Sequence, residues 1–175
     1  PYEERIVSVT PDQAANLHID NPRVWWSHDL GTPELYEMNV QVETEGAVSD
    51  RKDVTFGIRK IESRLNEYGY RQFTLNGKDI LIKGAGWTDD IFLRDTPESL
   101  ERQIRYVKDM NMNLVRFENI WGKDDTVYDL CDRHGVLALV GWSCQWEWEN
   151  YCGIPEIHHV GCIYEPKEID LAARY

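Results

Sequence analysis

The apolar run Ile80-Leu81-Ile82-Lys83-Gly84-Ala85-Gly86 leads into Trp87-Thr88-Asp89-Asp90, and it is the first of three such runs before Trp148. Two further apolar runs follow it, Leu114-Val115 before Arg116-Phe117-Glu118-Asn119 and residues 137–140 before Gly141-Trp142-Ser143-Cys144. Helical patterns separate the three runs, so we expect successive strand–helix units of a parallel sheet. The active residues of a β/α barrel lie at the C-terminal ends of its strands. Carboxylates and tryptophans at three successive strand ends therefore predict one wall of a sugar-binding cleft.

The two helices between these strands carry their own start and stop signals. Thr96 is a suitable N-cap, and the apolar spacing that follows it predicts a helix ending near Met110. Asp124 or Asp125 can cap the second helix, and Gly135 stands where a helix C′ glycine belongs. The pattern from residue 80 onward is therefore strand, helix, strand, helix, strand.

Residues 1–62 carry strand patterns instead. Ile6-Val7-Ser8-Val9 predicts a short strand, and apolar and polar residues alternate from Leu35 to Val42 as in a half-buried antiparallel strand. Residues 46–53 predict a polar turn region, and residues 54–58 predict a further strand. The chain is therefore expected to be all-β in its N-terminal part and α/β after it.

Asn76-Gly77 lies between two apolar runs, residues 73–75 and 80–82. This dipeptide is the strongest short hairpin signal, because both central residues of a type I′ turn need positive φ. The three parallel strands predicted after it would leave an open sheet edge and an incomplete core. Together with a start at Pro1 rather than Met and an end at Tyr175 inside a helical pattern, this predicts that the chain is a piece of a longer protein.

Composition argues against several classes of function. The 175 residues carry a formal net charge of −12, which disfavours binding to a nucleic-acid backbone, so we expect no nucleic-acid partner. No stretch reaches the roughly 18 apolar residues of a membrane span, so we expect no membrane insertion. The cysteines lack zinc-site spacing and no phosphate-binding loop is present, so neither a metal nor a cofactor is expected. Cys131 is expected to be a buried thiol, whereas a disulfide among Cys144, Cys152 and Cys162 stays open.

Several stretches between Asn21 and about Glu149 follow a known order and spacing. They are Asn21 to Trp26 with Leu35-Tyr36, Phe56 to Arg59, Phe73 to Lys78 with Ile82-Lys83-Gly84, Asn113 to Arg116, and Asp129 to Asp132 with Gly135 to Leu137. In this order they resemble the glycoside hydrolases of family two. Gly86 to Arg94 looks like the branch that holds the β-mannosidases and exo-β-D-glucosaminidases. Val115 to Glu118 and Gly141 to Cys144 look closest to the exo-β-D-glucosaminidases.

The resemblance implies an immunoglobulin-like β-sandwich followed by a (β/α)8 TIM barrel. Residues 1–62 are then the C-terminal portion of the sandwich, and residues 63–175 are the N-terminal portion of the barrel, which the rest of the parent chain completes. The implied activity is that of a retaining β-glycoside hydrolase acting on glucosamine-type oligosaccharides. The family's acid/base and nucleophile follow the fourth and about the seventh barrel strand, which places them beyond Tyr175. No catalytic residue is therefore assigned within the chain, and the chain alone is expected to be inactive.

Five residues are expected to bind substrate: Asp90, Glu118, Trp142, Trp87 and Arg116. By resemblance, acidic residues at the positions of Asp90 and Glu118 recognise the substrate amine. Asp90 could instead cap a turn, and Glu118 could form a structural ion pair with Arg116 or a loop lysine. Arg116 could orient catalytic carboxylates by bidentate hydrogen bonds or belong to a buried ion pair. Trp142 and Trp87 could stack on sugar faces or pack in a core.

Two alternatives remain open at this stage. A β-mannosidase-like member of the same family would use Asp90 and Glu118 for hydroxyl groups, and a non-catalytic carbohydrate-binding or interaction module would use its surface without hydrolysis. Degradation of polysaccharides fits a secreted or periplasmic protein, by analogy with the family.

Overall fold

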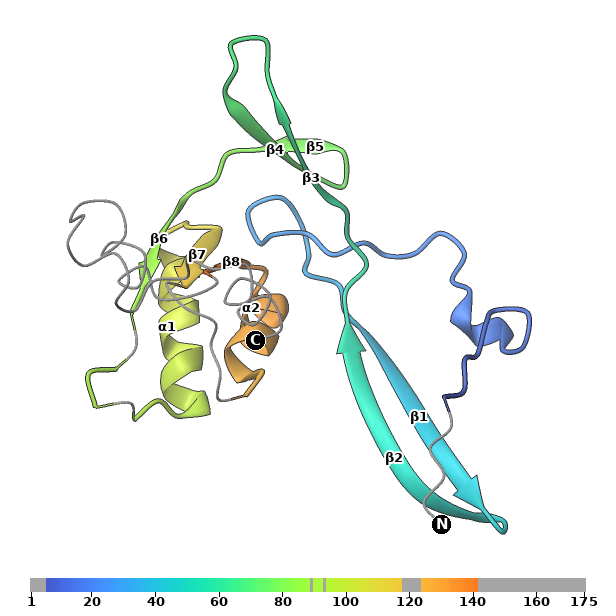
Figure 1. Cartoon of the computed structure of the whole chain (residues 1–175). Helices are drawn as coiled ribbons and strands as arrows, with labels where there is room; N and C mark the ends of the chain where they lie inside the picture. The colour runs from blue at the N-terminus through green and yellow to red at the C-terminus, as the bar shows by residue number, and fades with distance from the viewer. Residues whose placement is uncertain (1–5, 89, 93, 118–123, 142–175) are drawn as a thin grey trace, which may run out of the picture.

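The computed structural model describes residues 6–88, 90–92, 94–117 and 124–141 (Figure 1). After a 3-10 turn, η1 (Ala15–Leu17), come the strands β1 (Tyr36–Thr44), β2 (Ala47–Phe56), β3 (Ile61–Leu65), β4 (Arg71–Leu75), β5 (Lys78–Ile80) and β6 (Gly84–Trp87). The helix α1 (Pro97–Asp109), the strand β7 (Leu114–Phe117), the helix α2 (Thr126–His134) and the strand β8 (Leu137–Val140) follow. Within these residues β1-β2 and β3-β4-β5 form antiparallel sheets, and β6-β7-β8 form a parallel one.

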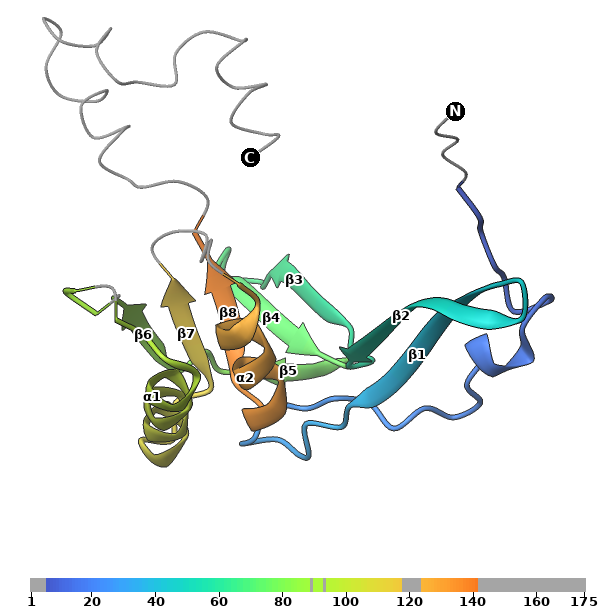
Figure 2. The same ribbon diagram turned by 90° about the horizontal axis from the view of Figure 1, so that it is seen from below.

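The parallel sheet and its helices form the strand–helix–strand–helix–strand unit that the sequence predicts. Both helices cover the same face of the sheet (Figure 2). α1 begins with a capping box, in which Thr96 Oγ1 accepts a hydrogen bond from Ser99 N at 3.2 Å and Ser99 Oγ accepts one from Thr96 N at 2.9 Å. The N-cap of α2 is Asp125, whose side chain forms no capping hydrogen bond, and the preceding Asp124 accepts a hydrogen bond from Thr126 N at 3.0 Å. Gly135 ends α2 with a φ of 72°, a left-handed conformation that glycine adopts without strain.

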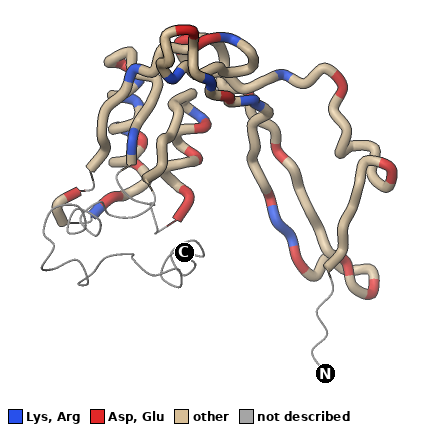
Figure 3. Tube along the Cα trace, turned by 45° about the horizontal axis from the view of Figure 1, so that its top comes forward, with Lys and Arg blue, Asp and Glu red and all other residues tan. Residues whose placement is uncertain are grey.

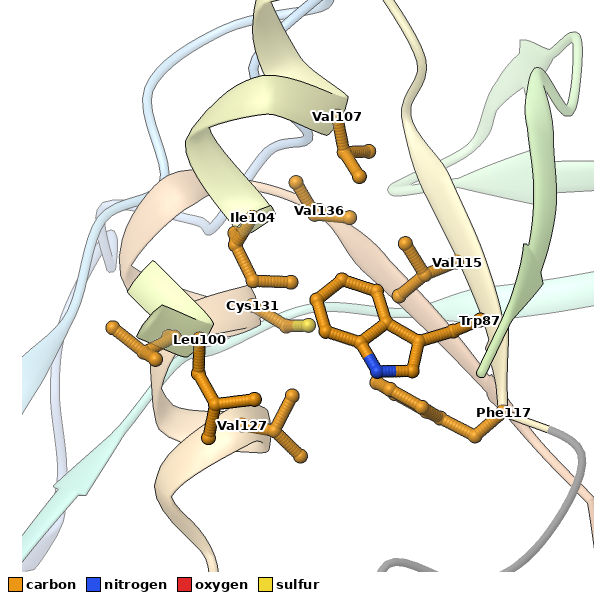
Figure 4. Packing of buried hydrophobic residues seen from close by; sticks show 10 residues of the cluster. Trp87, Leu100, Ile104, Val107, Val115, Phe117, Val127, Cys131 and Val136 are labelled. Atoms are coloured by element: carbon orange, nitrogen blue, oxygen red, sulfur yellow. The ribbon is translucent and has the colours of Figure 1, made fainter. Parts of the chain in front are cut away.

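The main hydrophobic core lies between this sheet and its two helices (Figure 4). Its buried residues are Trp87, Val115 and Phe117 from the strands, Leu100, Ile104 and Val107 from α1, Val127, Leu130 and Cys131 from α2, and Val136. Full burial of one large apolar side chain contributes about 1.5–3 kcal/mol. These side chains therefore hold both helices against the sheet.

The opposite face of the parallel sheet is covered at only one end. A second cluster is built from Trp25, Leu75 and Leu137, with the partly buried Ile80, Ile82 and Leu114 packed against it. Leu114 and Leu137 begin their strands, whereas Arg116 and Leu139 lie two residues further along and are exposed. The helix-free face is thus closed where the strands begin and open where they end.

Trp25 joins the β-rich part of the chain to α2. It is fully buried, and its indole N–H donates a hydrogen bond to Asp132 O at 2.7 Å. The Arg59 guanidinium lies 4.7 Å from the centroid of the Trp25 ring and pairs with the Asp132 carboxylate at 2.8 Å. The side-chain amide of Asn76 donates to Trp25 O at 2.9 Å. Residues far apart in the sequence are therefore held at one point.

Two predictions for the N-terminal part are wrong. Residues 6–9 form no strand, and Ile6 is 93% exposed. Residues 46–53 are not a turn region, because the turn is confined to Glu45 and Gly46 and β2 runs from Ala47 onward. Polar residues fill this strand because both faces of the β1-β2 ribbon are largely exposed, so no buried face demands an apolar alternation.

The alternating strand is confirmed, but its burial is not uniform. Tyr36 and Met38 are half-buried as the alternation predicts. Val40 and Val42 share their face and yet are 45% and 54% exposed. The strand is therefore half-buried only along its first half in the described residues.

The Asn76-Gly77 hairpin is confirmed. Both residues have positive φ, 50° for Asn76 and 79° for Gly77, as a type I′ turn requires. The second arm is β5, which starts directly after the turn and ends at Ile80, earlier than the sequence suggested. β3 spans residue 62, where the sequence places a domain boundary, and that boundary stays a prediction.

Candidate functional site

The three parallel strands end together at one edge of the sheet, as the sequence predicts. Trp87, Phe117 and Val140 are partners in register, and Gly141 N donates a hydrogen bond to Phe117 O at 2.9 Å. The segments that leave these strand ends therefore start side by side. Glu118 and Trp142 stand at the beginning of two of these segments but lie outside the described residues, so their roles stay predictions.

Arg116 stands on the open, helix-free face near this edge. Its neighbours in register are Gly86 and Leu139, while Val115 and Phe117 point toward the helices. A Cβ atom built at Gly86 would meet no atom within 4 Å. Within the described part of the chain the Arg116 guanidinium forms no ion pair. Its five N–H donors are thus available to a carboxylate or to sugar hydroxyls.

Asp90 shapes the loop that follows β6. Its Oδ1 accepts hydrogen bonds from Phe92 N at 2.9 Å and Arg94 N at 3.2 Å. The side chain is exposed, and the Arg94 guanidinium lies 5.4 Å from the centroid of the Phe92 ring. The turn-capping role that the sequence left open for Asp90 is therefore present, and contact with a substrate stays a prediction.

Trp87 packs in the core between the parallel sheet and the helices. The residue is only 8% exposed, and its ring packs edge-on against Phe117 with centroids 5.8 Å apart (Figure 4). Successive side chains of a strand point to opposite faces of the sheet, so Trp87 faces the helices because Gly86 lies on the open face. The ring therefore packs in the core of the sheet–helix interface, which is the alternative that the sequence left open, and contact with a sugar stays a prediction. In β6 the two glycines lie on one face, and Ala85 and Trp87 lie on the other. This alternation is the sequence signal that places the Trp87 ring on the face opposite to the glycines.

A cavity of about 510 Å³ lies along β6 and α1. Its lining includes Gly86, Trp87, Arg102 and Tyr106. Of the predicted substrate-binding residues that the structure describes, Trp87 lines this cavity, whereas Arg116 and Asp90 do not.

Two other groups in the described residues are engaged in structure. The thiol of Cys131 is buried, as expected, and burial together with the nearby Asp132 carboxylate raises its pKa to about 12. His134 Nε2 lies 3.3 Å from Glu101 Oε1, so the last residue of α2 contacts α1.

Three general properties complete the description of the surface. Asp and Glu residues occur in both the β-rich and the α/β part of the molecule (Figure 3). Among the described residues no group of three or more His, Cys, Asp or Glu side chains is placed to hold a metal ion. None of the described helices combines the length and the apolar character that crossing a membrane requires.

Comparison with known proteins agrees with this arrangement. A family model described as glycosyl hydrolases family 2 matches residues 3–59. An exo-beta-D-glucosaminidase of Streptomyces avermitilis is 39% identical over 149 residues, which are 85% of this chain and 16% of that protein. A mannosylglycoprotein endo-beta-mannosidase of Lilium longiflorum is 32% identical over 137 residues, covering 74% of this chain and 14% of that protein.

A solved structure shows the same relationship. The crystal structure of the exo-chitosanase of Amycolatopsis orientalis matches with a TM-score of 0.74 at 30% identity, over 89% of this chain and 18% of that one. The chain thus spans between 14% and 18% of the length of these relatives.

Proposed function

The chain belongs to glycosyl hydrolase family 2, and on that premise we propose that the whole protein is a β-glycoside hydrolase of the exo-β-D-glucosaminidase type. It removes glucosamine-type units from oligosaccharides such as those of chitosan. In this proposal the β-rich part is the end of an immunoglobulin-like sandwich, and β6 to β8 are the first strands of a (β/α)8 barrel, whose strand ends line the active site.

The observation that carries the proposal is the position of Arg116. In a chain 39% identical to an exo-beta-D-glucosaminidase, it is a charged side chain on the open face, close to where β6, β7 and β8 end. A guanidinium in that place can hold a carboxylate in a fixed orientation. Retaining hydrolysis needs two carboxyl groups about 5–5.5 Å apart, one as acid/base and one as nucleophile. We assign neither role within this chain, and we expect the chain alone to be inactive.

Asp90 and Glu118 are proposed to recognise the amine of the substrate. Each follows the end of one strand of the parallel sheet, and a carboxylate forms strong, charge-assisted hydrogen bonds with an ammonium group. Trp142 follows the third strand end and is proposed to stack on a sugar ring. By analogy with polysaccharide-degrading enzymes, a secreted or periplasmic location is proposed.

A β-mannosidase is the second candidate, because the endo-beta-mannosidase of Lilium longiflorum is 32% identical over 74% of the chain. Hydrolysis of aryl β-D-glucosaminide and aryl β-D-mannoside by the whole protein, with the 175-residue chain alone as control, separates the two. We expect the whole protein to cleave the glucosaminide and the 175-residue chain alone to cleave neither substrate. Preferential cleavage of the mannoside would move the assignment to β-mannosidase. Cleavage of neither would favour a non-catalytic carbohydrate-binding module.

The substitution Glu118→Gln tests recognition of the amine. It removes the negative charge and keeps the size of the side chain, so the glucosaminide should lose far more kcat/KM than the mannoside. Loss of a charge-assisted hydrogen bond corresponds to about 1.5–3 kcal/mol, which is a factor of about 10 to 150 in kcat/KM. An equal loss with both substrates would show that Glu118 does not read the amine.

A further inference from the structure

A buried polar network lies where the parallel strands begin. Its centre is Asn113, which is 1% exposed. The amide NH₂ of Asn113 donates to Asp29 Oδ2 and to Leu81 O, both at 2.9 Å, and the amide oxygen accepts from Lys83 N at 2.8 Å. Asp29 Oδ2 also pairs with Lys83 Nζ at 3.1 Å, and Asp29 Oδ1 accepts from Ser27 Oγ at 2.7 Å.

The backbone of Asn113 connects the same point to both neighbouring strands. Asn113 N donates to Lys83 O at 2.8 Å, and Asn113 O accepts from Leu137 N at 2.8 Å. Lys83 directly precedes β6, Asn113 directly precedes β7, and Leu137 is the first residue of β8. One residue therefore fixes the starting points of all three strands relative to each other.

Asp29 joins the residues that directly precede two of the strands. Its Oδ2 accepts a hydrogen bond from Asn113 Nδ2 at 2.9 Å and pairs with Lys83 Nζ at 3.1 Å. The orientation of the Asn113 amide is fixed by Leu81 O, which can only accept, and by Lys83 N, which can only donate. Asp29 therefore acts by holding Asn113 and Lys83 together and not by selecting the orientation of the amide. Asp29 lies 84 residues away in the sequence, in the β-rich part of the chain.

This contact matters because β7 is short. The strand has four residues, and Arg116 is its third. A slip of one residue would turn Arg116 toward the helices and bring an apolar neighbour to the open face, because side chains alternate between the two faces. The burial of Val115 and Phe117 favours the native register, and the hydrogen bonds at Asn113 add to the few ladder hydrogen bonds of a four-residue strand.

We propose that Asp29 is a positioning residue for the active site. Through Asn113 it fixes the register of β7 against β6 and β8, and it thereby places Arg116 on the open face at the strand ends. This inference rests on the proposed function, in which Arg116 orients a carboxylate. It gives a residue of the β-rich part a role in hydrolysis without contact with substrate.

The test compares Asp29→Ala with Asp132→Ala in the whole protein. Asp132 is a matched control, because its ion pair with Arg59 at 2.8 Å also joins the β-rich part to the α/β part but does not touch a strand start. We expect Asp29→Ala to lower kcat for aryl β-D-glucosaminide by about tenfold or more with little change in KM. Asp132→Ala should lower the thermal midpoint and leave kcat within about twofold of wild type. Equal kcat in the two variants would overturn the inference and leave the proposed function standing.

A double variant asks whether Asp29 acts through Asn113. If it does, Asp29→Ala combined with Asn113→Ala should be no slower than Asn113→Ala alone, because the second change removes an interaction that is already lost. Additive losses in kcat would contradict the inference.

Hydrogen exchange separates this inference from the proposed function. Asp29→Ala should speed exchange of the backbone amides of residues 115–117, and Asp132→Ala should not. This readout holds even if the whole protein cleaves neither glycoside. In that case the proposed function fails, and unchanged exchange in Asp29→Ala would also overturn the register role.

Discussion

Gly84 and Gly86 lie on the same face of β6, but only Gly84 lacks room for a side chain. A Cβ atom at Gly84 would lie 2.3 Å from Leu114 O, whereas one at Gly86 would meet nothing within 4 Å. The obstacle at Gly84 is backbone, so Gly84→Ala must push β6 away from β7, and we expect a loss of about 1–3 kcal/mol. Gly86→Ala is the matched control and should stay within about 0.5 kcal/mol. Equal thermal midpoints would show that β6 and β7 do not approach so closely.

Trp87 allows a second prediction for a single residue. A role in the core affects the stability of the protein, whereas a role in sugar binding affects KM. Trp87→Phe removes part of a buried ring system, and we expect it to cost less than the about 3–5 kcal/mol of truncation to alanine. KM for the glucosaminide should not change, because the ring faces the helices. A raised KM with an unchanged unfolding midpoint would restore the sugar-stacking role.

The Cys131 thiol provides a chemical probe of the same core. Burial raises its pKa to about 12, so at pH 8 the folded protein holds it as an unreactive thiol, whereas an unfolded cysteine has a pKa of about 8.5. Because the folded pKa is the higher one, stability from this group is complete below about pH 8.5 and is lost as the pH rises toward 12. Alkylation at pH 8 followed by peptide mass mapping should label Cys131 only in denaturant. Equally fast labelling of the native protein would contradict the burial.

At the scale of elements, the end of α2 is fitted against the loop at His28. Gly135 has a φ of 72°, and a Cβ there would lie 2.7 Å from His28 N, which donates a hydrogen bond to Gly135 O at 2.9 Å. Gly69 has a φ of 78° and nothing within 4 Å of a built Cβ, so it bears the left-handed strain without the contact. We expect Gly69→Ala to cost about 1–2 kcal/mol, and Gly135→Ala to cost clearly more. Equal losses in unfolding free energy would mean that the loop at His28 moves away from a side chain at position 135 at no cost in stability.

The elements that the sequence predicts well depend on local chemistry. The Thr96 cap, the Gly135 helix end and the Asn76-Gly77 turn each need only neighbouring residues, and all three are confirmed. The turn predicted over residues 46–53 is wrong, because an exposed ribbon tolerates polar side chains that elsewhere indicate a turn.

The candidate site was less predictable, because it depends on which face of the sheet each side chain occupies and on contacts between residues far apart in the sequence. The ends of the strands and their order could be predicted. The face of the sheet on which Trp87 lies could not, because a shift of one residue in the four-residue strand β6 would move its side chain to the other face. The contact of Asp29 with Asn113 joins residues 84 positions apart, and no local sequence pattern predicts it.

In the whole molecule, two of the contacts between the β-rich and α/β parts differ in their chemistry. One is the apolar and cationic contact of Trp25 and Arg59 with α2, and the other is the polar network of Asp29 with Lys83 and Asn113. The first joins the β-rich part to a helix, and the second joins it to the beginnings of the strands. The second contact is centred on Asp29, whose pKa is lowered, so we expect it to weaken in acid.

The pH dependence of stability tests this expectation. Burial alone would raise the pKa of Asp29, but hydrogen bonds from Ser27, Asn113 and Lys83 and the Lys83 charge outweigh burial and hold the pKa below its usual value of 3.8. Because the folded pKa is the lower one, Asp29 contributes stability above about pH 4, and this contribution is lost as the pH falls through the folded pKa.

Asp29→Asn should therefore reduce the unfolding free energy at pH 6, and the difference from wild type should shrink steadily below pH 4. Urea unfolding followed between pH 6 and pH 2 measures it, and Asp12→Asn, at an exposed carboxylate, should follow wild type throughout. A difference between Asp29→Asn and wild type that stayed constant down to pH 2 would mean that the Asp29 charge does not hold the two parts together.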